Sequence, residues 1–188
     1  MALIAFYDAS VLYPAPLRDF LMRLALTDLY RAKWSAKVHE EWIGVVLRDR
    51  PDLRLEQLER TRRLMDAHVR DCLVEHFESL IDGLDLPDPN NRHILAAAIH
   101  GRADVIVTRN LKDFPADKLE PYGIEAQHPD TFITHLIDLD PGAVVGAARD
   151  HRASLRNPPK DVEEYLNTLE RQGLTQTAVA LRGYASVL

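Results

Sequence analysis

Four acidic residues stand where a fold of alternating strands and helices could gather their carboxylates in one pocket. They are Asp8, Glu41, Asp88 and Asp113. Carboxylates that converge in a buried site repel one another, and their pKa values rise unless a cation neutralises the charge. Hard oxygen ligands suit Mg²⁺ or Mn²⁺ rather than zinc, and two such ions can support the cleavage of a phosphodiester bond. Together the four acids are candidate ligands for one or two divalent cations, whose chemistry can act on phosphodiester bonds.

Each acid also has an ordinary structural interpretation when it is taken alone. Asp8 follows a strand and Asp88 precedes a proline, and both are common turn or cap positions. Glu41 could lie in the solvated first turn of a helix, where the helix dipole favours acids. Asp113 could cap the turn that follows it. Only the joint arrangement of the four favours catalysis.

The predicted elements explain how these residues could meet. Short apolar runs predict buried strands at residues 3–7 and 104–108 and an edge strand at 123–126. Apolar residues at helical spacing predict helices over residues 17–25, 38–46, 55–69 and 94–100. Strands that alternate with helices favour an α/β fold around a mostly parallel sheet.

Polar side chains follow two of the predicted strands. Asp8 and Ser10 follow the first, and Thr108 and Asn110 follow the second. Ligands of open parallel sheets bind beyond the carboxyl ends of the strands, so these four residues lie where chemistry usually occurs. The spacing of Glu41 within its helix turns it toward the buried side.

The last part of the chain is predicted to be helical. Apolar residues recur at helical spacing from about residue 129, and Asn157-Pro158-Pro159 interrupts the pattern. We expect residues 1–134 to form the α/β domain and residues 135–188 to form a helical C-terminal appendage.

Composition excludes several classes of protein. The chain has 188 residues, of which 46% are hydrophobic and 28% charged, an ordinary globular mixture. We expect no membrane span, because no stretch of about 18 consecutive apolar residues exists. We expect no signal peptide, because no basic region precedes the short apolar start, which meets an acid at Asp8. Cys72 is the only cysteine, which excludes an intrachain disulfide and favours the cytoplasm. The net charge of −6 counts only mildly against nucleic acid, since bound cations reverse the local sign.

Four ordered motifs resemble those of the PIN domain. They are Tyr7-Asp-Ala-Ser-Val-Leu12, Trp34-Ser with Glu41-Trp42, Leu86-Pro-Asp-Pro-Asn-Asn-Arg-His with Ala96-Ala-Ala, and Val105-Ile-Val-Thr-Arg-Asn-Leu-Lys-Asp-Phe-Pro115. The chain is most similar to the VapC-like branch of toxin–antitoxin ribonucleases. The resemblance covers about residues 3–130, and the tail resembles a helical C-terminal domain found in some members of that branch.

The resemblance implies a three-layer α/β/α core and RNA cleavage that depends on Mg²⁺ or Mn²⁺. It also implies a homodimer and a cognate antitoxin as partner. Glu41 is preferred over Glu40 as the helix glutamate because it precedes Trp42. The implied catalytic and metal-binding residues are Asp8, Glu41, Asp88 and Asp113, with Asn91 as a further metal ligand. The implied supporting residues are Ser10, Thr108, Asn110 and Arg92.

The sequence departs from the family pattern at two places. The third motif is commonly Asp-Pro-Asp-Asp, whereas here Asn90 and Asn91 follow Asp88 and Pro89. Many relatives carry an acid at the position of Asn110. An amide oxygen can bind a hard cation but brings no charge to it.

Two alternatives compete with a nuclease. A PIN domain of weak or no activity could serve as an RNA- or protein-binding module, and the two amides after Pro89 keep this alternative open. A phosphatase with an aspartyl nucleophile is disfavoured, because Ser10 occupies the position where such enzymes place a second Asp.

Overall fold

The computed structural model describes residues 2–188, which form two compact units. The first unit holds the residues up to Tyr13 together with Tyr30–His128. The second holds Pro14–Leu29 together with Pro129–Leu188.

A four-stranded parallel sheet forms the centre of the first unit. Its strands are β1 (Leu3–Tyr7), β2 (Tyr30–Lys33), β3 (Val105–Val107) and β4 (Glu125–Gln127), in the order β2-β1-β3-β4. The inner strand β3 is buried throughout, as its three apolar residues require. Tyr7 pairs with Val107, so the residues that follow β1 and β3 emerge side by side.

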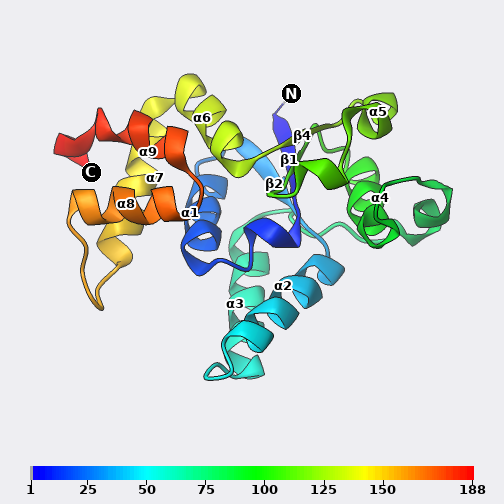
Figure 1. Cartoon of the computed structure of the whole chain (residues 1–188), viewed down its shortest axis with the longest axis horizontal. Helices are drawn as coiled ribbons and strands as arrows, with labels where there is room; N and C mark the ends of the chain where they lie inside the picture. Colours follow the sequence, from blue (N-terminus) through cyan, green and yellow to red (C-terminus); the bar gives the residue numbers. More distant parts are fainter. Residues whose placement is uncertain (1) are drawn as a thin grey trace. The chain divides into compact units, whose positions relative to one another are not determined.

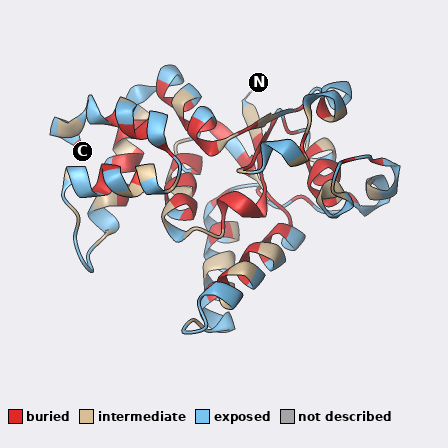
Figure 2. Ribbon diagram, in the orientation of Figure 1, coloured by how far each residue is buried: buried red, intermediate tan, exposed pale blue. Residues whose placement is uncertain are grey.

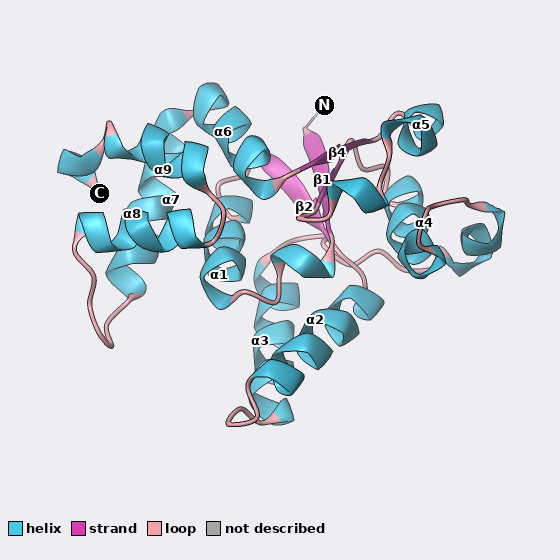
Figure 3. Ribbon diagram, viewed as in Figure 1, coloured by secondary structure: helices cyan, strands magenta, loops and turns pink. Residues whose placement is uncertain are grey.

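Helices surround this sheet (Figure 3). The α-helices are α2 (Ala36–Asp49), α3 (Leu55–His68), α4 (Arg92–His100) and α5 (Ala116–Leu119). Short 3-10 turns are η1 (Ala9–Val11), η2 (Glu78–Gly83), η3 (Pro89–Asn91), η4 (Leu111–Asp113) and η5 (Glu120–Tyr122). Buried positions follow one side of α2 and fill most of α4 (Figure 2), so the sequence pattern of each helix matches how deeply it is packed.

The second unit is helical (Figure 1). It contains α1 (Ala15–Ala25), α6 (Pro129–Leu139), α7 (Pro141–Ser154), α8 (Val162–Arg171), α9 (Thr175–Arg182) and η6 (Ala185–Val187). Phe20 of α1 stacks on His151 of α7 with ring centroids 5.7 Å apart, and His151 Nδ1 lies 3.0 Å from the Tyr165 hydroxyl of α8. These buried rings join α1 to α7 and α8, which come much later in the chain.

One carboxylate ties α6 to the start of α9. Asp130 accepts hydrogen bonds from the backbone N–H groups of Gln176 (2.9 Å) and Thr177 (2.8 Å) and from the Thr177 hydroxyl (2.7 Å). The first turn of a helix has unsatisfied N–H groups and a partial positive charge, so an acid from a neighbouring helix stabilises it.

The predicted α/β class with a parallel sheet and C-terminal helices is confirmed. Strand β2 was not predicted, and helix α1 groups with the C-terminal helices, which the sequence analysis did not anticipate. The boundary between residues 134 and 135 stays a prediction. Across residues 2–188, no helix combines the length and the apolar character that crossing a membrane requires.

Candidate active site

Asp8 lies at the carboxyl end of β1 and is almost completely buried, with 6% of its surface exposed. Its backbone N–H donates to Val107 O at 3.1 Å, which continues the pairing of β1 with β3. The Ser10 and Thr108 hydroxyls both donate to Asp8 Oδ2, at 2.7 and 2.8 Å. Residues that follow two different strands therefore hold one carboxylate.

The same two hydroxyls are fixed from behind by backbone amides. Arg109 N donates to Ser10 Oγ at 3.0 Å, and Asn110 N donates to Thr108 Oγ1 at 3.0 Å. A hydroxyl has only one proton to give. Because each oxygen accepts an amide proton, each hydroxyl proton is directed to Asp8. The loop after β3 thereby sets the orientation of the carboxylate.

Burial raises the pKa of Asp8 above its usual value. The hydrogen bonds from Ser10 and Thr108 oppose this by lowering the pKa, whereas the negative charge of Glu41 raises it. Glu41 is therefore close enough to Asp8 for their charges to interact. A buried carboxylate and a half-buried one that repel each other form a hard-oxygen donor pair that a divalent cation would stabilise.

Glu41 belongs to α2, whose start is defined by Ser35. The Ser35 side chain accepts a hydrogen bond from Val38 N at 3.2 Å and caps the helix. Glu41 is half-buried, and its neighbour Glu40 is exposed. This difference agrees with the choice of Glu41 as the site residue.

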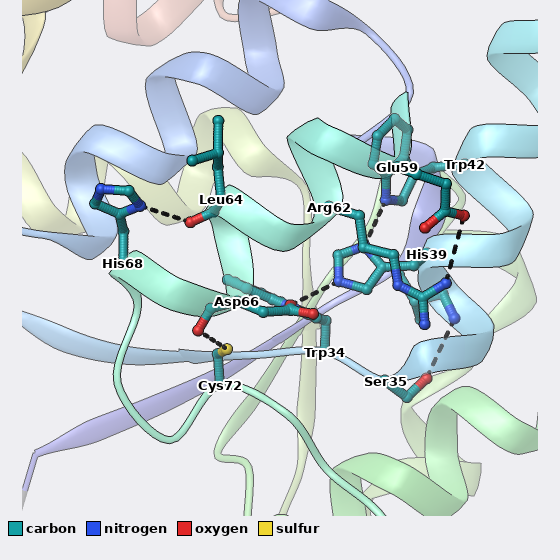
Figure 4. Close-up of polar contacts among 11 residues, drawn as sticks. Trp34, Ser35, His39, Trp42, Glu59, Arg62, Leu64, Asp66, His68 and Cys72 are labelled. Carbon is teal, nitrogen blue, oxygen red and sulfur yellow. Dashed lines mark hydrogen bonds and ion pairs between the residues drawn. The ribbon is translucent and has the colours of Figure 1, made fainter. Parts of the chain in front are cut away.

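A buried polar network anchors α2 to α3 (Figure 4). Trp42 Nε1 donates to His39 Nδ1 at 2.9 Å, and an indole nitrogen can only donate. His39 therefore carries its proton on Nε2 and donates it to Asp66 Oδ1 at 2.8 Å, where Trp34 Nε1 also donates at 2.8 Å. Since Trp42 directly follows Glu41, this network also fixes the turn of α2 that presents Glu41.

Glu41 contacts a residue of α4. Glu41 Oε1 lies 2.6 Å from Nε2 of His93, which is 3% exposed, although the N–H direction is not aligned for a hydrogen bond. Both residues line a cavity of about 300 Å³ together with Lys37, Ile81, Pro89 and Asn90. The sequence signals this contact only through the place of His93 at the end of the run Leu86-Pro-Asp-Pro-Asn-Asn-Arg-His.

The other predicted site residues lie in or beside short turns, and Asp88 and Arg92 make hydrogen bonds within their own segment. Asp88 accepts a hydrogen bond from Asn90 N at 2.9 Å and so caps its own turn η3. Arg92 Nε donates to Pro89 O at 3.2 Å. Asp113 ends η4 and is half-buried, and Asn91 ends η3.

Among residues 2–188, no group of three or more His, Cys, Asp or Glu side chains is arranged to hold a metal ion. The structure brings Asp8, Ser10 and Thr108 together and couples them by charge to Glu41. The larger ligand set, with Asp88, Asn91 and Asp113, stays a prediction.

Comparisons with known proteins match both parts of the chain. Residues 5–112 match the PIN domain model, and residues 129–183 match the VapC50 C-terminal domain model. A protein of Mycobacterium tuberculosis named "Putative ribonuclease VapC50" is 41% identical over 96 residues, which cover 51% of this chain and 57% of that protein. No solved structure matches the chain.

Proposed function

This chain belongs to the PIN domain family, and we propose that it is a divalent-metal-dependent endoribonuclease. The observation that supports this most directly is the state of Asp8. A buried carboxylate, held by Ser10 and Thr108 and repelled by Glu41, is costly without a compensating charge. A divalent cation bound at this site would supply that compensating charge.

Asp8 and Glu41 would hold Mg²⁺ or Mn²⁺ in this proposal, and Asp88, Asn91 and Asp113 are proposed to complete the set. A bound cation of this kind promotes the attack of water on a phosphodiester and stabilises the charge on the phosphate. Ser10 and Thr108 keep Oδ2 of Asp8 oriented, so this carboxylate need not reorganise during the reaction. Arg92 and the backbone near Asn110 are proposed to contact RNA phosphates.

The biological role that we propose is that of a toxin in a toxin–antitoxin pair. The support is the resemblance to VapC-like proteins and the match of residues 129–183 to the VapC50 C-terminal domain. An RNA substrate would place the protein in the cytoplasm, as a homodimer bound by its antitoxin. Expression of the chain alone should slow bacterial growth, and expression of Asp8→Asn should not.

A second candidate function is that of an RNA- or protein-binding module without catalysis. Two observations favour it. Asn90 and Asn91 bring no charge to the third motif, and the Asp88 carboxylate is engaged in capping its own turn.

RNA cleavage by the purified protein separates the two candidates. Single-stranded RNA would be incubated with the protein in EDTA, and then with excess Mg²⁺ or Mn²⁺ added back. A nuclease should release fragments only after the metal is restored. A binding module should retain RNA in a gel-shift assay under both conditions without cutting it.

A further inference from the structure

We propose that His93 is a positioning residue that holds the Glu41 carboxylate beside Asp8. The proposal rests on the proposed metal-dependent function of this site. It assigns a task to a residue that the family resemblance leaves without one.

His93 is a buried polar side chain that contacts a charged residue. The ring is 3% exposed, and neither ring nitrogen forms an aligned hydrogen bond with any group in residues 2–188. The Glu41 carboxylate meets the ring, with Oε1 2.6 Å from Nε2. A buried imidazole without hydrogen bonds is unfavourable, so packing alone does not explain a histidine at this position. A carboxylate that can turn into line with the Nε2–H group supplies the partner that the ring needs.

Glu41 needs such a restraint because another position is open to it. Its side chain is 37% exposed and lines the cavity of about 300 Å³ beside α2. Lys37 lies one helical turn earlier and lines the same cavity, so its ammonium group could attract the carboxylate away from Asp8. Repulsion by Asp8 acts on the same carboxylate. His93, whose Nε2 lies 2.6 Å from Glu41 Oε1, limits how far that carboxylate can move.

The consequence concerns the pair of carboxylates rather than the fold. While Glu41 contacts His93, the negative charge of Glu41 still raises the pKa of Asp8. His93 thus keeps the two acids close before a cation arrives, in the way that outer hydrogen-bond partners orient metal ligands. One oxygen of Glu41 is occupied by the ring, and the other remains for the cation.

The test compares two amides of different reach at position 93. A Gln amide nitrogen reaches about as far as Nε2, whereas the Asn amide nitrogen is one methylene shorter. Mn²⁺ affinity would be measured by the electron paramagnetic resonance of free Mn²⁺ for wild type, His93→Gln and His93→Asn. His100→Gln, at the exposed end of the same helix, is the matched control. Circular dichroism in EDTA reports the fold of each variant.

We expect His93→Asn to weaken Mn²⁺ binding about tenfold or more and His93→Gln to stay within about threefold of wild type. His100→Gln should bind as wild type does. If His93→Asn does not fold, His93→Leu, which fills the site without a donor, takes its place with the same expectation. Folded variants that all bind Mn²⁺ like wild type would overturn the positioning role, as would equal losses in His93→Gln and His93→Asn.

The same titration distinguishes failure of this inference from failure of the proposed function. A wild-type protein that binds Mn²⁺ and loses it in Asp8→Asn retains the proposed site whatever happens at position 93. A wild-type protein that binds no Mn²⁺ overturns the proposed function and this inference together.

Discussion

Thr108 Oγ1 donates a hydrogen bond of 2.8 Å to Oδ2 of Asp8, a residue one hundred positions earlier in the chain. The contact exists because Tyr7 pairs with Val107 across two parallel strands, so the next residue of each strand emerges at the same edge. Everything proposed for this site depends on that register.

Thr108→Val tests the hydroxyl at this contact. The substitution keeps the shape of the side chain but removes the donor to Asp8 and the acceptor for Asn110 N. We expect a loss of about 1–3 kcal/mol in the free energy of unfolding, measured with urea, because a buried group loses its partner. RNA cleavage should fall as well. Thr61→Val is the control: Thr61 is half-buried in α3, its hydroxyl donates to the Gln57 carbonyl within the same helix, and its loss should cost less than about 1 kcal/mol.

Asp8→Asn should stabilise the protein when no metal is present. Burial raises the pKa of folded Asp8 above its usual 3.8, so the folded state holds the proton more tightly than the unfolded state does. The stability that this proton adds is complete below the pKa of Asp8 in the unfolded chain. It is lost as the pH rises through the pKa of Asp8 in the folded protein. The Asn oxygen can still accept both hydroxyl protons.

Melting temperatures in EDTA from pH 4 to pH 8 measure this effect. The melting temperature of wild type should fall below that of Asp8→Asn by an amount that grows as the pH rises. Addition of Mn²⁺ at pH 7.5 should raise the melting temperature of wild type alone. Parallel pH profiles of the two proteins would show that Asp8 carries no buried charge.

Asp66→Ala tests the network that holds α2. The Asp66 carboxylate accepts the N–H groups of Trp34 and His39, which are both buried. Their loss should cost about 2–4 kcal/mol of unfolding free energy, since two donors remain without an acceptor. Asp49→Ala at the exposed end of α2 should cost less than about 1 kcal/mol. Equal effects of the two substitutions in urea unfolding would contradict the role given to the network.

Asn91→Asp tests whether the third motif faces the cation. The substitution restores the acid that the family pattern commonly has and adds one negative charge. We expect tighter Mn²⁺ binding by calorimetry, by about three- to tenfold, because charged oxygen ligands raise the affinity for hard cations. Asn157→Asp, in the turn between α7 and α8, adds the same charge elsewhere and should leave the affinity unchanged. Unchanged or weaker binding in Asn91→Asp would remove Asn91 from the ligand set.

The sequence predicted the strand-end part of the site because that part follows from local pattern. Apolar runs that end in Asp8 and Thr108 indicate buried strands, and parallel strands bring their carboxyl ends to one edge. Strand β2 escaped prediction because it has only four residues and two of them, Arg31 and Lys33, are cations. It lies at an edge of the sheet, where one side remains open to such residues.

Contacts between distant segments could not be predicted from local pattern. Nothing in the spacing of α2 and α4 indicates that His93 meets Glu41, because the contact depends on how two helices pack. The grouping of α1 with the C-terminal helices likewise depends on Phe20 stacking on His151. The sequence placed Asp88 in a turn correctly but could not show that its carboxylate bonds to Asn90 N of that turn.

The most direct test of the proposed function is RNA cleavage by Asp8→Asn beside a matched control. Asp49→Asn removes the same charge from the exposed end of α2 and leaves the site intact. Both variants and wild type would cut a labelled single-stranded RNA in Mn²⁺, with initial rates compared after folding is verified by circular dichroism. We predict that Asp8→Asn loses on the order of 100-fold or more in rate, since loss of even an outer partner of a metal ligand costs about 10- to 100-fold, whereas Asp49→Asn cleaves like wild type. A folded Asp8→Asn that cleaves RNA at the wild-type rate would contradict the account.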